Sequence, residues 1–216
     1  MEASFWHQKW ARGEIGFHQK DINPFLLKHL EKLNVPNGSR IFLPLCGKTR
    51  DFTFLLANGY QVVGAELSEL AIKELFKELC LNPETTPVGE LIRYSAQDID
   101  VFVGNIFDVT AEYLGHISAI YDRAALVALP VEIRAQYTSH LINITNSAPQ
   151  LLVTYDYDQK LMDGPPFSLS ESEVKQHYGS KYQLKVLESN FVLGGLKGKI
   201  KSTETAWLLE KINKMV

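Results

Sequence analysis

Short apolar runs alternate with stretches of helical spacing between residues 40 and 155. Five of the apolar runs indicate buried strands, at residues 41–45, 61–66, 100–105, 117–123 and 151–155. The stretches between them repeat apolar residues every three or four positions, at residues 51–58, 68–79 and 130–141. Gly59 supplies a helix end and Ser68 a helix N-cap. Alternating strands and helices predict a doubly wound α/β fold with a mostly parallel sheet.

The two ends of the chain follow other patterns. Strand patterns at 182–188 and 205–210 flank a glycine- and lysine-rich loop and predict an antiparallel edge hairpin, which brings the expected sheet to seven strands. Residues 82–89 are rich in turn formers and are interpreted as a surface excursion. Residues 1–36 have helical spacing and end at a proline-glycine turn. We therefore expect one domain, with a helical segment at 1–36 that acts as a lid and an α/β core at 40–216.

Composition narrows the class of protein. The chain has 216 residues, of which 45% are hydrophobic and 22% charged, which excludes a disordered, collagen-like or coiled-coil protein. Its formal net charge of -3 argues against a nucleic-acid partner held by phosphate neutralisation. Two cysteines, Cys46 and Cys80, are too few for a disulfide framework and fit a reducing compartment.

The sequence carries no sign of export or of membrane insertion. Glu2 stands where a signal peptide would be basic, and no apolar h-region follows it. No stretch approaches the ~20 apolar residues that a bilayer span requires. We expect a soluble, cytoplasmic protein without a membrane partner.

The segment 43–49 (LPLCGKT) imitates a phosphate-binding loop. Its ending Gly47-Lys48-Thr49 matches a P-loop, but Phe42 occupies the position of the required first glycine. The pattern argues against an NTPase, and no dinucleotide-binding G-x-G-x-x-G is present. Cys46 is placed at a helix start, where a thiol pKa falls, but it lacks a histidine partner and is interpreted as a packing residue.

Polar residues follow the strands at their carboxyl ends, where parallel α/β sheets bind ligands. Glu66 ends the second strand, 19 residues after Gly47, and an acid at that spacing commonly accepts hydrogen bonds from ribose hydroxyls of an adenosine cofactor. An alternative of equal weight is that Glu66 is a neighbour of a helix cap or a solvated acid at the end of a strand. Asn105 follows the third strand in the same way.

Arg123 ends the fourth strand. Its planar guanidinium suits bidentate binding of a carboxylate or stacking on a ring. The competing interpretation is an internal ion pair with Asp122 or Asp98.

Aromatic residues are dense near the N-terminus. Trp6 and Trp10 share one helix face, and with Phe17 they belong to a hydrophobic core more often than to a cofactor site. His7 and His18 lack partners at metal-ligand spacing, so no metal site is expected.

Several unusual segments together resemble the thiopurine S-methyltransferase family, and its bacterial more than its mammalian members. They occur in the family's order, above all PLCGK in place of a glycine-rich loop. They are FWHQKW at 5–10, GFHQ at 16–19, FLPLCGK at 42–48, VVGAELS at 62–68, NIFD at 105–108, YDRAAL at 121–126 and GPPF at 164–167.

The resemblance implies a class I, Rossmann-like methyltransferase that depends on S-adenosylmethionine. Carried over position by position, it implies that the Leu45 backbone lies near the methionine moiety and that Glu66 binds the ribose. It further implies that Asn105 and Ile106 flank the adenine and that Trp10 closes over the cofactor.

On the acceptor side, the resemblance implies roles for Phe17 and Arg123. Arg123 would lie beside the cofactor and bind a substrate anion or stabilise a thiolate. The implied reaction is S-methylation of thiopurines and other aromatic or heterocyclic thiols, with selenium and tellurium compounds as further acceptors, by a monomeric enzyme. The alternatives are a non-catalytic adenosine-ligand module and a methyltransferase acting on nitrogen or oxygen.

Overall fold

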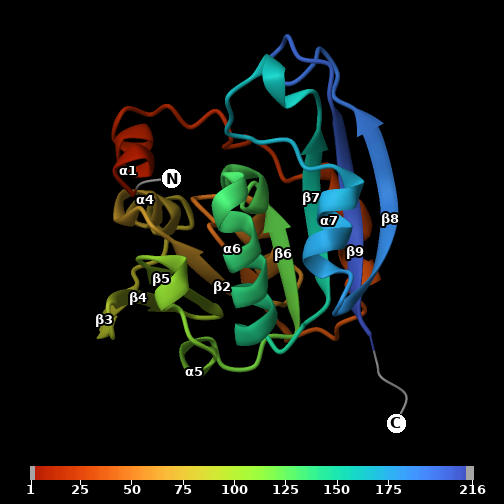
Figure 1. Ribbon diagram of the computed structural model, residues 1–216. Coiled ribbons are helices and arrows are strands. Elements are labelled where there is room, and N and C mark those ends of the chain that lie inside the picture. The colour runs from red at the N-terminus through yellow and green to blue at the C-terminus, as the bar shows by residue number, and fades with distance from the viewer. Residues whose placement is uncertain (1–2, 213–216) are drawn as a thin grey trace.

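The computed structural model describes residues 3–212 and builds the fold on one mixed β-sheet (Figure 1). The strands are β1 (Arg40–Leu43), β2 (Gln61–Glu66), β3 (Glu84–Val88), β4 (Leu91–Ala96), β5 (Ile99–Val103), β6 (Ala119–Arg123), β7 (Gln150–Asp156), β8 (Tyr182–Phe191) and β9 (Thr203–Lys211). Within residues 3–212 they form a nine-stranded sheet in the order β3-β4-β5-β2-β1-β6-β7-β9-β8. The strands from β5 to β7 in this order are parallel, and β9 and β8 form the expected antiparallel hairpin at one edge. The mostly parallel, doubly wound architecture is therefore confirmed.

Helices cover both faces of this sheet (Figure 1). The α-helices are α1 (Ala3–Ala11), α2 (Pro24–His29), α3 (Asp51–Ala57), α4 (Glu69–Glu78), α5 (Ala111–Leu114), α6 (Val131–Ile144) and α7 (Glu171–Tyr178). Short 3₁₀ turns occur at η1 (Leu30–Leu33), η2 (Ile106–Asp108), η3 (Leu126–Ala128) and η4 (Gln159–Leu161). One core lies between the sheet and α5, α6 and α7, and the other between the sheet and α2, α3 and α4.

Burial on both faces explains the uninterrupted apolar strands. In β1, Phe42 belongs to the core under α6, whereas Ile41 and Leu43 belong to the core under α3. A strand whose two faces are both covered needs apolar residues at every position. Such runs are the strongest secondary-structure signal in this chain.

The expected number of strands was wrong, because β3 and β4 extend the sheet beyond β5. Residues 82–89, interpreted as a surface excursion, contain the whole of β3, whose residues are almost all exposed and which pairs with β4. In β4, Arg93 and Ser95 donate to Asp100 of β5, at 2.8 and 2.7 Å. Leu91 and Tyr94 of β4 reach the two cores, but the buried positions do not alternate along β4 and β3 is exposed, so the hairpin leaves no hydrophobic alternation in the sequence.

Candidate active site

The sequence-predicted residues meet at the carboxyl edge of the parallel strands. The order β5-β2-β1-β6 places the ends of these strands side by side, so the segments around Asn105, Glu66, Leu45 and Arg123 follow one another along this edge. The strands β2 to β5 lie on one side of β1, and the strands from β6 onwards lie on its other side, so the order of the strands reverses between β1 and β6. Open α/β sheets bind ligands at such a switch point.

The turn after β1 has an unusual backbone. Leu45 and Gly47 both have positive φ, 47° and 53°. Only the glycine adopts this conformation without strain, so Leu45 is held there by its surroundings. The Cys46 N–H contributes by donating to the Ala65 carbonyl of β2 at 2.9 Å. Leu45 thus stands half-buried at the switch point.

Glu66 is buried at the end of β2, with 6% of its surface exposed. Its two carboxylate oxygens accept hydrogen bonds from the backbone N–H groups of Gly47 and Ser68, each at 2.8 Å. Burial raises the pKa of this carboxyl group, and the backbone donors partly oppose the rise. The interpretation as a solvated acid was wrong. Because a carboxylate has about four acceptor positions, two remain available to a ligand.

Asn105 and Ile106 lie next to this carboxylate along the edge. The Gly104 N–H donates to the main-chain carbonyl of Glu66 at 2.9 Å, which joins the end of β5 to that of β2. The Asn105 side chain is exposed, and its oxygen accepts from the Phe107 N–H at 3.2 Å to start η2. Ile106 is buried, and its carbonyl accepts from His140 Nε2 at 2.9 Å.

Aromatic side chains of the N-terminal segment cover the turn after β1. Trp10 is buried, and a Cβ added at Gly47 would meet its ring at 3.1 Å. The Phe17 ring makes edge contacts with Trp10 and Trp6, at centroid distances of 5.5 and 5.7 Å. Trp6 and Phe17 remain partly exposed. Trp10 therefore lies against the turn after β1, while Trp6 and Phe17 form a partly exposed outer layer around it.

Arg123 is half-buried at the end of β6, and neither expected ion pair forms. Asp122 is fully buried and accepts from Tyr137 Oη at 2.7 Å and from the Leu126 N–H at 3.0 Å. Burial raises the pKa of Asp122 to about 6. Asp98 precedes β5, at the opposite edge of the sheet. Within residues 3–212, Arg123 makes no ion pair, so its guanidinium is available to a ligand.

Three further polar side chains near Arg123 were missed by the sequence analysis. Tyr121, Asp51 and Glu204 each have a buried oxygen without a hydrogen-bond partner in the part of the chain that the structure describes. Tyr121 lies two residues before Arg123 on the same strand, so period-two alternation was an available signal for it. Nothing in the local sequence points to the other two.

The residues that imitate a P-loop serve the fold. Lys48 forms ion pairs with Glu74 and Glu78 of α4, at 2.9 and 2.8 Å. Cys46 is buried, and burial raises the pKa of its thiol well above the ordinary value. The expected lowering of that pKa at a helix start was wrong, because α3 begins only at Asp51, and burial together with the Glu66 charge raises the pKa. The assignment of Cys46 to packing is consistent with this burial.

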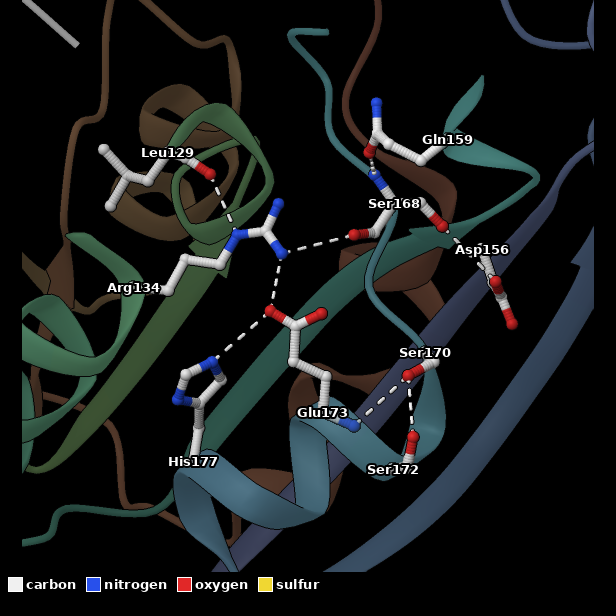
Figure 2. Close-up of polar contacts among 9 residues, drawn as sticks. All are labelled: Leu129, Arg134, Asp156, Gln159, Ser168, Ser170, Ser172, Glu173 and His177. Carbon is white, nitrogen blue, oxygen red and sulfur yellow. Dashed lines mark hydrogen bonds and ion pairs between the residues drawn. The ribbon is translucent and has the colours of Figure 1, made fainter. Parts of the chain in front are cut away.

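A buried arginine anchors the loop that follows β7 (Figure 2). Arg134 of α6 donates to the carbonyls of Leu129 and Ser168, at 2.9 and 3.3 Å, and pairs with Glu173 of α7 at 2.5 Å. Its guanidinium also lies over the Phe167 ring, 5.5 Å from the centroid. These contacts hold the GPPF segment against α6 and α7. We refer to this group of contacts as the Arg134 clamp.

Comparisons with known proteins identify relatives over almost the whole chain. The family model described as thiopurine S-methyltransferase matches residues 1–214. A thiopurine S-methyltransferase of Teredinibacter turnerae is 51% identical over 211 residues, 98% of each chain. One of Xanthobacter autotrophicus is 49% identical over 212 residues, 98% of this chain and all of that one.

Solved structures share the fold at low sequence identity. The Burkholderia thailandensis 1,6-didemethyltoxoflavin-N1-methyltransferase, solved with S-adenosylhomocysteine, has a TM-score of 0.65 at 12% identity and covers 97% of this chain and 87% of that one. Within residues 3–212, no helix is both long and apolar enough to cross a membrane.

Proposed function

This chain belongs to the thiopurine S-methyltransferase family of S-adenosylmethionine-dependent enzymes, and from that premise we propose that it methylates the sulfur of thiopurines and other aromatic or heterocyclic thiols. The proposal extends to selenium and tellurium compounds, whose nucleophilic atoms resemble a thiolate. The observation that carries it is the position of Arg123 at the end of β6, where it makes no ion pair within residues 3–212 and shares the carboxyl edge of the sheet with the buried Glu66.

The donor side fits an adenosine cofactor. Glu66 keeps two acceptor positions for ribose hydroxyls, and the Leu45 backbone adjoins it for the methionine moiety. Asn105 and Ile106, next along the edge, would flank the adenine. Bound S-adenosylmethionine supplies an activated methyl group on a sulfonium. Trp10 would cover that sulfonium, and a cation–π contact contributes about 1–2 kcal/mol when desolvated.

The protein itself has to align the reactants and exclude water. Phe17 and Arg123 would contact the acceptor, and Arg123 would stabilise its thiolate through charge-assisted hydrogen bonds. Aromatic thiols ionise readily, so no strong general base is needed. Both cysteines are free, which is consistent with the reducing cytoplasm that we propose as the protein's location.

Turnover with matched acceptors tests the proposal. Thiophenol, aniline and phenol share a ring and differ in the nucleophilic atom, and mercaptopurine adds the heterocycle. With labelled S-adenosylmethionine, we expect S-adenosylhomocysteine to form with both thiols and not with the amine or the alcohol. Methylation of aniline or phenol would indicate an N- or O-directed enzyme, and donor binding without any turnover would indicate a binding module.

The expectation that all of residues 1–36 form a lid is too broad, because α2 and η1 pack into the core on one face of the sheet. We further propose that only the part up to Phe17 acts as a lid over both substrates. The Trp10 ring lies against Gly47, whereas Trp6 and Phe17 form a partly exposed outer layer. S-Adenosylhomocysteine together with an aromatic thiol should protect this segment from limited proteolysis, because closure buries it. Equal cleavage rates with and without ligands would show that the segment is permanent packing.

A further inference from the structure

Arg123, Tyr155 and Glu204 lie near one another in the sheet. In the strand registers, Arg123 of β6 is opposite Val153 of β7, and Tyr155 is directly opposite Glu204 of β9. The register thus brings the three side chains near one another at the carboxyl end of the parallel strands, where Glu204 and Arg123 both affect the pKa of Tyr155.

Glu204 and Arg123 are near one another without pairing. Burial raises the pKa of Glu204, while the Tyr155 hydroxyl and the Arg123 charge act in the opposite direction. Yet the two charged groups are not within ion-pairing distance, and Glu204 Oε1 is buried without a hydrogen-bond partner among residues 3–212. A buried carboxylate oxygen without a donor costs free energy. A ligand that brings an N–H group would remove this cost.

Two further polar side chains, Tyr121 and Asp51, lie close to Arg123. Tyr121 Oη and Asp51 Oδ2 are buried and have no partner in the described chain, and the two residues are 2% and 1% exposed. Asp51 is fixed by its other oxygen, which accepts from the Asn23 N–H at 2.9 Å. The Asp51 and Arg123 charges both affect the pKa of Tyr121, so these groups lie close together. Because the Tyr121 hydroxyl and the Asp51 carboxylate also interact with each other, they form a polar wall beside Arg123, and the Glu204 oxygen remains for an N–H group of a ligand.

We propose that Glu204 is a specificity-determining residue, which accepts a hydrogen bond from an N–H group of a heterocyclic acceptor while Arg123 faces its sulfur. The inference rests on the proposed function and deepens it. A heterocyclic thiol of the purine type carries ring N–H donors as well as sulfur, so it can satisfy both groups at once. A plain aryl thiol satisfies only Arg123. Sites built around a buried hydrogen-bonding group discriminate strongly against analogues that lack the matching group.

The test compares two acceptors of similar shape that differ in the thiolate form: mercaptobenzimidazole keeps one ring N–H group, whereas mercaptobenzothiazole, with sulfur at that ring position, keeps none. For Glu204→Met we expect kcat/KM for the benzimidazole to fall by on the order of tenfold or more, since a hydrogen bond to a charged group is lost. For the benzothiazole it should change little. Glu204→Gln keeps one acceptor oxygen and should retain part of the preference. Glu210→Gln, an exposed position on the same strand, is the matched control.

Donor affinity and thermal stability are measured on the same proteins, so that a folding defect is recognised. Equal losses for both acceptors, or no loss for either, would overturn the role of Glu204. If Glu204→Met fails to fold, Glu204→Gln serves as the test. A ratio of kcat/KM for the benzimidazole over the benzothiazole equal to that of the wild type would then overturn the role of Glu204. Failure of the wild-type enzyme to methylate any thiol would overturn the proposed function instead.

Discussion

The two halves of the carboxyl edge satisfy their polar groups in different ways. On the β1–β2 side, Glu66 is held by the backbone N–H groups of Gly47 and Ser68 before any ligand binds. On the β6–β7–β9 side, Arg123 has no ion-pair partner within residues 3–212, and Glu204 keeps a buried oxygen without a donor. We propose that the first half is preorganised for S-adenosylmethionine, which is the same in every reaction. The second half leaves groups for the ligand to satisfy, which suits discrimination among acceptors.

The two halves of the carboxyl edge also differ in the contacts that stabilise them. The β1–β2 side depends on hydrogen bonds within the sheet and its first turn, such as that from the Cys46 N–H to Ala65. The other side depends on side chains that tie separate elements together, namely the Arg134 clamp and the contacts of Glu188 with α2. Substitutions at these places should therefore separate the two halves experimentally.

The largest effect is expected at the Arg134 clamp. Arg134→Met leaves Glu173 and two carbonyls without their buried donor, and removing one partner of a buried ion pair costs about 3–5 kcal/mol. Urea denaturation should report this loss in the free energy of unfolding. Lys175→Met removes the exposed Lys175–Glu171 pair of α7 and is the control, expected to cost less than ~0.5 kcal/mol. Similar losses in the two variants would show that the clamp contributes no more than a surface pair.

Glu66→Ala should weaken donor binding by roughly 2–4 kcal/mol, on the order of 30- to 1,000-fold, if two charged hydrogen bonds to the ribose are lost. It should also lower the melting temperature, because the N–H groups of Gly47 and Ser68 lose their acceptor. Glu66→Gln keeps one acceptor oxygen and should retain more stability than affinity. Isothermal calorimetry with S-adenosylmethionine measures the affinity. Unchanged binding in both variants would remove Glu66 from the donor site.

Arg123→Ala should lower kcat/KM for thiols by about 1.5–3 kcal/mol, roughly 10- to 150-fold, since a charge-assisted hydrogen bond to the thiolate is lost. Arg123→Lys keeps the charge without the planar fork and should recover part of the activity. Donor affinity and melting temperature should stay close to those of the wild type, because Arg123 makes no ion pair within the described chain. A variant that loses stability before it loses turnover would assign Arg123 a structural role.

The smallest effect is expected at Glu188, which joins β8 to α2. Hydrogen bonds from Lys28, Asn190 and His29 lower the pKa of Glu188 to about 2. The stabilisation is complete above the ordinary pKa of 4.5 and is lost as the pH falls through about 2. Because these groups are partly exposed, Glu188→Gln should cost less than ~1 kcal/mol near neutral pH.

Denaturation of wild type and Glu188→Gln at a series of pH values measures this difference. It should shrink towards zero at the acidic end and also at high salt, where exposed charges are screened. A difference that is constant with pH would mean that the contacts of Glu188 do not depend on its charge.

Most of the parallel core and of the donor side could be predicted from the sequence. Strands covered on both faces need continuous apolar runs, and parallel topology then brings their carboxyl ends together. The positions of Leu45, Glu66, Asn105 and Arg123 along one edge follow from these two facts. The β3–β4 hairpin could not be predicted in this way, because β3 is exposed and the buried positions of β4 do not alternate.

Only the tertiary structure decided how the polar groups at that edge are partnered. Nothing in the sequence places two backbone N–H groups on Glu66, or turns Asp122 towards Tyr137 and away from Arg123. The pairing of Tyr155 with Glu204 depends on the antiparallel register of β9 between β7 and β8. Register joins residues far apart in the chain, and side-chain partners depend on burial and direction, so neither is a property of local sequence.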